Sequence, residues 1–192
     1  YDNSIGGFQI FSYSAHYKVL TFLAAGRMVY AKGVDTLVEA FKIFAQKNSD
    51  WKLLLVGDGE ELPTIKDKIK EYGLEKRILT PGKTSDIKKY FLQSSVLLLP
   101  SRWEGMPMIV LESLEMGCPI VAFDIDAMRP LVTNGIEGLI VKEKQDANAY
   151  AQAMLKIAES EDLRKQMHQA ALQKANQFSV GKIMSEWEKI LK

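Results

Sequence analysis

The chain has 192 residues, of which 47% are hydrophobic and 26% are charged, so it is long enough to bury its own core and one globular domain is expected. Its 25 basic and 24 acidic residues nearly cancel, which argues against nucleic acid as a partner and means that any anion site must be built locally. The single cysteine, Cys118, excludes an internal disulfide and favours a reducing, cytoplasmic location. No apolar run approaches the ~20 residues that span a bilayer.

The first residues resemble neither a signal peptide nor a natural start, because they contain no basic or apolar segment and no initiator Met. We therefore expect the chain to derive from a longer protein. Residues 1–18 mix glycines, serines and aromatic residues without a sustained period, which predicts a linker or connecting segment. The folded domain is predicted over residues 19–192.

Six short apolar runs, each ending at Gly, Pro, Ser or Asp, are predicted to be strands covered on both faces. They are residues 19–25, 51–56, 78–80, 96–99, 119–123 and 138–141. Amphipathic segments separate these runs, and the clearest carries Val34, Leu37, Val38, Phe41 and Phe44 at helical spacing. Further helices are predicted over 62–72 and 87–91, and the pattern after residue 141 is wholly helical, up to an apolar face at 183–190. This order predicts an α/β fold with a doubly wound, Rossmann-like parallel sheet of about six strands, followed by C-terminal helices.

In open sheets of this kind, ligands bind outside the carboxyl ends of the strands. The loop after the first strand starts at Gly26 and contains Arg27 and Lys32 shortly before a helix. Together with free backbone N–H groups, these two cations could neutralise a diphosphate. The alternative is that both are solvated loop cations.

The loop after the fourth strand predicts a second part of the same site. Pro107 suits the first position of a helix, and Gly105 allows close approach of a ligand to the backbone. The N–H groups of Met106, Met108 and Ile109 would then form an anion seat at the helix start.

Two acids flank this helix start. Glu112 lies in an apolar segment, where a buried carboxylate needs hydrogen bonds that ribose hydroxyls could donate. Glu104 precedes the helix. The alternative is that Glu112 pairs with a structural cation and that Glu104 is simply an acid favoured by the helix dipole.

Three weaker features compete with this site. Gly57-Asp58-Gly59 resembles the start of a dinucleotide-binding motif, but Leu62 replaces its third glycine. Asp124 and Asp126 follow a strand and could bind a metal, yet no neighbouring acid or His completes a site, and a turn role is favoured. His168 has no catalytic partner in sequence and is expected to be exposed.

From residue 22 onward the chain resembles the C-terminal, donor-binding domain of family 4 of the retaining glycosyltransferases, which have the GT-B fold. The matching residues are Gly26-Arg27 with Lys32-Gly33, Leu55-Val56-Gly57-Asp58-Gly59, Pro100-Ser101 with Glu104-Gly105, Glu112, Gly117-Cys118-Pro119-Ile120-Val121, and Asn134-Gly135-Ile136-Glu137-Gly138-Leu139-Ile140-Val141. They include the two glutamates at E-x7-E spacing by which the family is known. Residues 126–130 depart from the family pattern, so the contacts of that loop are not transferred.

The resemblance implies that Arg27 and Lys32 neutralise the diphosphate of a nucleotide sugar, that Glu112 accepts hydrogen bonds from the ribose, and that Glu104 lies beside the donor sugar. Glu104, Arg27 and Lys32 are the expected catalytic residues, and the backbone of Met106, Met108 and Ile109 would hold phosphate. The donor-binding set is completed by Gly26, Gly105 and, in a base-contacting loop, Thr84. Because cations and helix dipoles stabilise the leaving group, no metal or cofactor is expected.

The sequence thus predicts transfer of a sugar from a nucleotide diphosphate, foremost UDP, to a saccharide or lipid-linked acceptor with retention of configuration. Departure and attack on one face of the sugar are implied, so Glu104 is not assigned as a nucleophile. The acceptor would be held by a missing N-terminal domain, without which the chain should be inactive. A cytoplasmic enzyme is expected, with peripheral association to the inner membrane face left open. A UDP-sugar epimerase of the same fold and a non-catalytic nucleotide-binding module remain alternatives.

Overall fold

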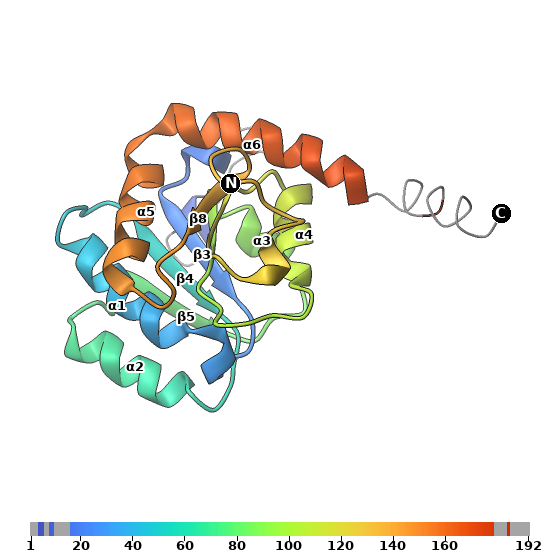
Figure 1. Cartoon of the computed structure of the whole chain (residues 1–192). Helices are drawn as coiled ribbons and strands as arrows, with labels where there is room; N and C mark the ends of the chain where they lie inside the picture. Colours follow the sequence, from blue (N-terminus) through green and yellow to red (C-terminus); the bar gives the residue numbers. More distant parts are fainter. Residues whose placement is uncertain (1–3, 6–7, 10–15, 179–183, 185–192) are drawn as a thin grey trace.

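The computed structural model describes residues 4–5, 8–9, 16–178 and 184 of the chain. A six-stranded sheet in the order β5-β4-β3-β6-β7-β8 forms its centre, and every neighbouring pair is parallel (Figure 1). Its strands are β3 (Thr21–Ala25), β4 (Lys52–Val56), β5 (Ile78–Gly82), β6 (Val96–Leu99), β7 (Ile120–Phe123) and β8 (Gly138–Val141). The predicted strands and the doubly wound order are confirmed.

Helices cover both faces of this sheet. On one face lie α1 (Val34–Ala45), α2 (Leu62–Glu71) and α5 (Ala147–Glu159), and on the other lie α3 (Lys88–Phe91) and α4 (Met108–Glu115) (Figure 1). Side chains alternate between the two faces along each strand, so Phe22 packs with the α1 side and Leu23 with the α4 side. The buried side chains form one apolar cluster on each face of the sheet. Because both faces of a strand are buried, its sequence is a continuous apolar run.

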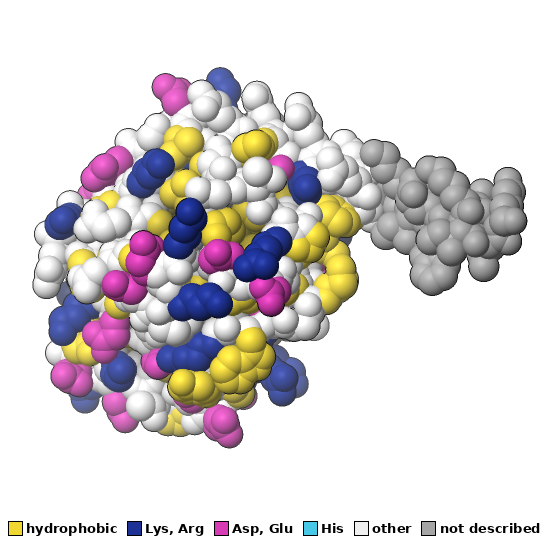
Figure 2. Space-filling view, in the orientation of Figure 1, with side chains coloured by type: hydrophobic (Ala, Val, Ile, Leu, Met, Phe, Trp, Pro, Cys, Tyr) yellow, Lys and Arg dark blue, Asp and Glu magenta, His cyan; other side chains and the backbone are white. Residues whose placement is uncertain are grey.

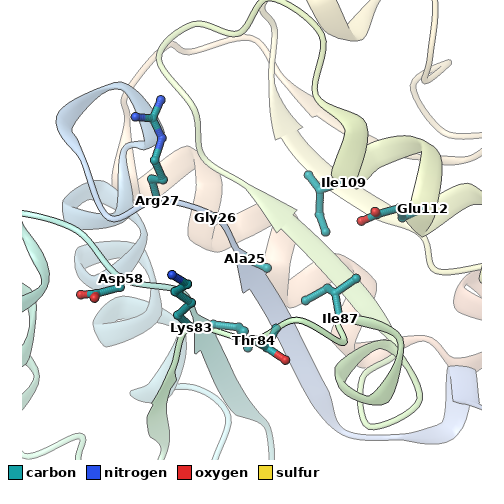
Figure 3. A pocket seen from close by; sticks show the side chains of 11 residues that line it. Ala25, Gly26, Arg27, Asp58, Lys83, Thr84, Ile87, Ile109 and Glu112 are labelled. Atoms are coloured by element: carbon teal, nitrogen blue, oxygen red, sulfur yellow. The ribbon is translucent and has the colours of Figure 1, made fainter.

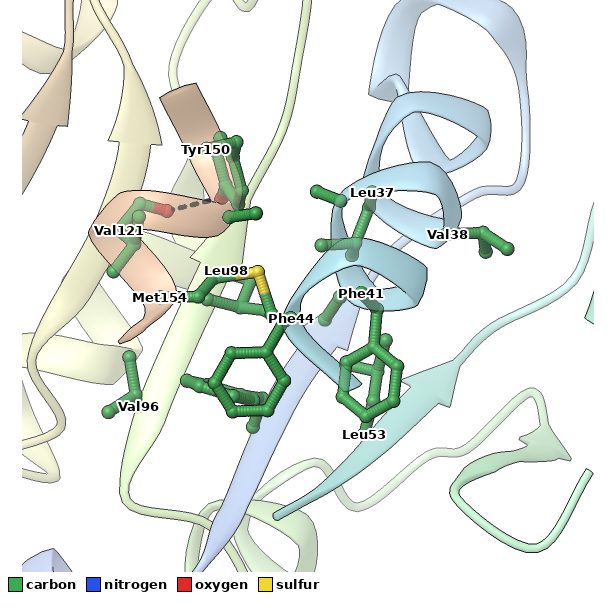
Figure 4. Close-up of a cluster of buried hydrophobic side chains, with 14 of the residues drawn as sticks. Leu37, Val38, Phe41, Phe44, Leu53, Val96, Leu98, Val121, Tyr150 and Met154 are labelled. Atoms are coloured by element: carbon green, nitrogen blue, oxygen red, sulfur yellow. Dashed lines mark hydrogen bonds between the residues drawn. The ribbon is translucent and has the colours of Figure 1, made fainter. Parts of the chain in front are cut away.

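The larger cluster joins α1 and α5 to the sheet (Figure 4). Phe41 and Phe44 of α1 and Met154 of α5 are completely buried in it. The hydroxyl of Tyr150 is buried as well, and it donates a hydrogen bond of 2.7 Å to the carbonyl oxygen of Val121. This bond fixes α5 against β7, since an unpaired buried hydroxyl would be costly.

A sixth helix, α6 (Glu161–Ala175), crosses the amino-terminal edge of the sheet (Figure 1). His168 of this helix is only 6% exposed, and its Nδ1 lies 2.7 Å from the carbonyl oxygen of Gly117. The prediction that His168 is solvent-exposed is therefore wrong: its imidazole ties α6 to the turn before β7. The site residues lie at the opposite, carboxyl edge.

Of the predicted linker, two short strands, β1 (Ser4–Ile5) and β2 (Phe8–Gln9), pair in antiparallel fashion, and His16–Lys18 forms a 3-10 turn. The remaining linker residues and most of the apolar face predicted at 183–190 lie outside the described part of the chain. Acidic and basic side chains are interspersed on the face seen in Figure 2. Among the residues that the structure describes, none of the helices combines the length and the apolarity that crossing a bilayer requires.

Candidate donor-binding site

The candidate site lies at the carboxyl edge of the sheet, where the strand order reverses. From β3 the chain proceeds to β4 on one side, while β6 pairs with β3 on the other side. The loops that follow β3 and β6 therefore diverge around a crevice, which is the usual ligand position in doubly wound sheets. Arg27 and Lys32 lie on the first of these loops, and Glu104 lies on the second.

The two loops approach each other closely at Gly33. Its φ is +63°, in the left-handed region, and a Cβ atom there would lie 2.2 Å from the carbonyl oxygen of Pro100. Only glycine fits this position without displacing the β6 loop. The backbone N–H of Arg102 also donates to the carbonyl oxygen of Ala31, at 2.9 Å. The loops after β3 and β6 are therefore one packed unit.

This packing brings Lys32 and Glu104 together. The Lys32 Nζ lies 2.5 Å from Glu104 Oε1, and the hydroxyl of Ser101 donates to the same oxygen at 2.7 Å. The Glu104 side chain is only 9% exposed, so a positive partner is needed to offset its desolvation. Two residues expected to contact the donor thus form an ion pair with each other. The ammonium retains further N–H donors for a second partner.

A pocket of about 350 Å³ opens at the carboxyl edge of the sheet (Figure 3). It is lined by Ala25, Gly26, Arg27, Val56, Gly57, Asp58, Lys83, Thr84, Ile87, Ile109 and Glu112. Arg27 and Lys83 lie on one side, and Ile109 and Glu112 lie on the other (Figure 3). The pocket therefore brings cations, a carboxylate and apolar side chains to one cavity of a size suited to a small ligand.

Five of the predicted site residues line this pocket, namely Gly26, Arg27, Thr84, Ile109 and Glu112. Lys32 lines a smaller adjoining hollow, shared with Arg27 and Ser101. Glu104, Gly105, Met106 and Met108 line neither cavity, and the two methionine side chains are exposed. The role predicted for Met106 and Met108 concerns their backbone, so the exposed side chains do not decide it.

The helix start offers the predicted N–H donors. α4 begins at Met108, one residue after the predicted start at Pro107, which is instead the N-cap and makes no side-chain cap. Within the described part of the chain, the N–H groups of Met106, Met108 and Ile109 donate to no protein acceptor. Such unpaired donors at the positive end of a helix favour an anion.

Glu112 is half-buried, and no described side chain donates a hydrogen bond to its carboxylate. Burial raises the pKa of this carboxyl above its usual value, the negative charge of Glu115 adds to the rise, and Lys88 partly opposes it. The carboxylate is thus an acceptor without donors on the wall of the pocket. A ligand with hydroxyl groups would supply them.

Arg27 is exposed, and within the described residues its guanidinium makes no hydrogen bond or ion pair. The Thr84 hydroxyl, by contrast, is engaged with its own loop: it donates to the carbonyl oxygen of Asp86 at 3.1 Å and accepts from the Asp86 N–H at 3.0 Å. Thr84 can therefore offer only a remaining lone pair to a ligand. Of these two pocket residues, Arg27 therefore has its whole guanidinium available to bind an anion, whereas Thr84 does not have its hydroxyl proton available.

The sequence-based prediction missed Lys83, Asp58 and Ile87 as pocket residues. Lys83 belongs to the segment Gly82-Lys83-Thr84, which resembles a base-contacting loop, but only Thr84 was assigned to the donor. Asp58 belongs to the Gly57-Asp58-Gly59 stretch that matches the family, and Ile87 begins the helix predicted over 87–91, but neither was assigned a ligand contact. Arg102, which holds the two loops together, was also overlooked.

The competing motifs have structural explanations. A Cβ atom at Gly57 would lie 1.8 Å from the Gly26 carbonyl oxygen, and one at Gly59 would lie 2.4 Å from that of Met28. The two glycines thus permit close packing of the loops after β3 and β4. Arg129 lies 3.7 Å from Asp124 and 3.1 Å from Asp126, which gives both acids a structural partner. Across the described residues, no group of three or more His, Cys, Asp or Glu side chains could hold a metal ion.

Comparison with known proteins decides the family. Residues 9–174 match the family model described as glycosyl transferases group 1. The chain belongs to the group 1 glycosyltransferases. The resemblance to the C-terminal domain of a GT-B glycosyltransferase is confirmed.

Two group 1 relatives illustrate the match. The amylovoran biosynthesis glycosyltransferase AmsD of Erwinia amylovora is 34% identical over 171 residues, covering 88% of this chain and 47% of AmsD. A protein of Escherichia coli, UDP-Gal:alpha-D-GlcNAc-diphosphoundecaprenol alpha-1,3-galactosyltransferase, is 31% identical over 145 residues, covering 74% of this chain and 37% of that protein. The chain spans about half the length of the curated relatives it matches.

A solved structure shows the same fold. Anabaena Alr3699/HepE, crystallised in complex with UDP, superposes with a TM-score of 0.82 at 22% identity, over 93% of this chain and 49% of HepE. At this identity the likeness supports the GT-B architecture alone.

Proposed function

We propose that this group 1 domain binds the nucleotide diphosphate of a sugar donor and that the complete enzyme transfers the sugar with retention of configuration. One observation carries the proposal: a single pocket is lined by Arg27 with an unpaired guanidinium, by Ile109 with an unpaired N–H group at the start of α4, and by Glu112 with an unpaired carboxylate. A nucleoside diphosphate has the matching chemistry, because it presents anionic oxygens beside ribose hydroxyls.

The two ends of the ligand are assigned to opposite sides of the site. The diphosphate lies near Gly26, Arg27 and Lys32. Its oxygens accept hydrogen bonds from the N–H groups of Met106, Met108 and Ile109, and Gly105 leaves room for its approach. The ribose donates to Glu112. The base lies near Thr84, where Ile87 offers apolar contact. Lys83 joins the cations of the site because it lines the same pocket.

Bond cleavage at the sugar places negative charge on the departing diphosphate. Arg27, Lys32 and the α4 N-terminus would stabilise that charge electrostatically, so in this proposal catalysis needs no metal or other cofactor. Glu104 is placed beside the sugar in this proposal, with its carboxylate held by Lys32 and Ser101, which both line the smaller adjoining hollow. It orients the donor and is not assigned as a nucleophile.

UDP is the proposed nucleotide, supported by the donor in the name of the Escherichia coli relative. That name also contains a lipid-linked saccharide, which supports a saccharide or lipid-linked acceptor here. The other half of the parent protein would hold the acceptor. We therefore expect the 192-residue chain to bind donor and to transfer no sugar, and the full-length enzyme to act in the cytoplasm, with access to a membrane-bound acceptor.

Calorimetry of the chain with UDP, GDP and ADP tests the donor site. UDP should bind most tightly, and Arg27→Ala and Glu112→Ala should each weaken it about tenfold or more, the loss of one charge-assisted hydrogen bond. Arg129→Ala is a matched control, since Arg129 lines a different pocket beside Asp124 and Asn134. Absence of UDP binding, or equal effects of all three substitutions, would contradict the site assignment.

Product analysis with the full-length enzyme separates the alternatives. A transferase moves the sugar to an acceptor and releases UDP, and Glu104→Ala should abolish transfer while UDP still binds. An epimerase would return an altered UDP-sugar without an acceptor. A binding module would leave the donor unchanged.

A further inference from the structure

Arg102 belongs to the loop that carries Glu104, and its side chain contacts the loop that carries Lys32. Its Nη1 donates to the carbonyl oxygen of Tyr30 at 2.6 Å, and its Nη1 and Nη2 form a fork with the Asp35 carboxylate at 2.9 and 2.8 Å. Its guanidinium carbon also lies 3.9 Å from the centroid of the Tyr30 ring. The Arg102 side chain is only 12% exposed, and the Asp35 side chain is 35% exposed, so the fork between them is partly buried.

The position of these contacts in the sequence matters for the site. Tyr30 precedes Lys32 by two residues, and Arg102 precedes Glu104 by two residues. The guanidinium therefore holds the backbone of the first loop, and its own backbone N–H donates to Ala31 at 2.9 Å. Both members of the Lys32–Glu104 pair are thus anchored through one side chain.

Asp35 provides the fixed end of this arrangement. It lies in the first turn of α1, where the helix dipole favours an acid, and α1 is packed on the sheet. Burial raises the pKa of Asp35, but hydrogen bonding to Arg102 and to the backbone N–H of Thr36 outweighs it, so the pKa lies below its usual value of 3.8. The carboxylate therefore stays charged, and the planar fork is retained at neutral pH.

We propose that Arg102 is a positioning residue that sets the separation between the Lys32 ammonium and the Glu104 carboxylate, and that Asp35 orients it. The catalytic part of this proposal rests on the proposed transferase function. Arg102 itself touches neither donor nor acceptor in this assignment. It acts by fixing the geometry of the pair, because small displacements of groups beside the reacting atoms lower rates steeply.

Arg102→Ala, Arg102→Lys and Asp35→Asn test the positioning role. In crystal structures of the variant chains, the Lys32 Nζ–Glu104 Oε1 distance should exceed hydrogen-bond reach, about 3.2 Å, for Arg102→Ala. In the full-length enzyme kcat should fall about 100-fold for Arg102→Ala. Arg102→Lys should recover little of this loss, since an ammonium cannot form the bidentate contact. Asp35→Asn keeps the size of the side chain and should give an intermediate loss.

Arg77→Ala is the matched control. Arg77 donates to the carbonyl oxygens of Trp51 and Asn48 at the amino edge of the sheet, away from the site. It should lower stability without lowering kcat at a temperature where the variant is folded. Guanidinium ion at millimolar concentration should restore part of the rate of Arg102→Ala and none of a general folding defect.

An unchanged Lys32–Glu104 distance in Arg102→Ala, or an equal loss of kcat in Arg77→Ala, would overturn the positioning role. Failure of the wild-type chain to bind UDP would instead count against the proposed function. The Lys32–Glu104 distance tests the positioning role whether or not UDP binds, because its measurement needs no substrate. If Arg102→Ala does not fold, the same distance is measured in Asp35→Asn, where a loosened fork should lengthen it.

Discussion

Glu104 Oε1 accepts from both the Lys32 ammonium, at 2.5 Å, and the Ser101 hydroxyl, at 2.7 Å. The pair joins residues 72 positions apart in sequence and holds one oxygen of the carboxylate in place. Its other oxygen makes no described hydrogen bond and is left for a ligand. Glu104 is therefore both the partner of a phosphate-binding cation and a group that can orient a sugar.

Glu104→Gln should separate these two roles. The amide oxygen can still accept from Lys32 and Ser101, so UDP affinity of the chain should stay within about threefold of wild type. Transfer by the full-length enzyme should fall about 100-fold, because the charge beside the donor sugar is lost. Ser101→Ala removes one neutral hydrogen bond and should cost less than tenfold. Steady-state kinetics and calorimetry measure the two effects, and an undiminished rate in Glu104→Gln would exclude Glu104 from the chemistry.

Glu112→Gln should raise stability and weaken UDP binding. Burial raises the pKa of Glu112, so the folded protein holds this proton more tightly than the unfolded chain does. The resulting stabilisation is present at low pH and is lost as the pH rises through the folded-state pKa. The Tm of Glu112→Gln relative to wild type should therefore increase with pH and level off once Glu112 is ionised, as thermal denaturation from pH 4 to 8 would show.

The affinity for UDP should follow the opposite trend. The ionised carboxylate is the better acceptor for ribose hydroxyls, so wild-type affinity should fall as the pH drops through the raised pKa of Glu112. Glu112→Gln should bind about tenfold more weakly at pH 7 and lack this component. The Glu112→Gln variant also serves as the control for protonation of UDP, because the ligand is the same with both proteins. Identical pH profiles for both proteins would mean that Glu112 does not bind the ribose.

The sheet and most of the site loops could be predicted because their signals are local. Each strand is a short apolar run, and Arg27 and Lys32 follow one such run directly. The Lys32–Glu104 pair, the Arg102–Asp35 fork and the burial of His168 depend on contacts between residues far apart in the chain. Hydrophobic periodicity in the sequence does not indicate such pairings. His168 was predicted to be exposed only because histidine is polar. The start of α4 was predicted to within one residue because Pro107 is a local signal.

Lys83→Gln should weaken UDP binding by a smaller factor than Arg27→Ala. Lys83 lines the same pocket and both side chains are exposed, but the Lys83 ammonium is a point charge, whereas the guanidinium of Arg27 can bind two diphosphate oxygens at once. A loss of about two- to fivefold is expected at low salt, shrinking as ionic strength rises. Lys70, exposed on α2, offers a control substitution outside the pocket. Calorimetry at two salt concentrations measures the difference, and a salt-independent loss would indicate a structural effect instead.

Gly57→Ala should disturb both the fold and the donor loop. Gly57 has a φ of +145°, and an added Cβ would lie 1.8 Å from the carbonyl oxygen of Gly26, a residue that lines the pocket. Gly73 is a matched control: its φ is +66°, but a Cβ there would meet nothing within 4 Å. Gly73→Ala should cost about 1 kcal/mol, the penalty for an L residue in this backbone region.

Gly57→Ala adds to such backbone strain a collision that only movement of the β3 loop can relieve. We expect a further loss of about 1–3 kcal/mol in the free energy of unfolding, measured by urea denaturation. UDP affinity should also fall in Gly57→Ala, because the displaced backbone carries Gly26 and Arg27, and should be unchanged in Gly73→Ala. Equal destabilisation by the two substitutions would show that the β3 loop yields without cost, and that the close packing at Gly57 does not hold the phosphate-binding loop in place.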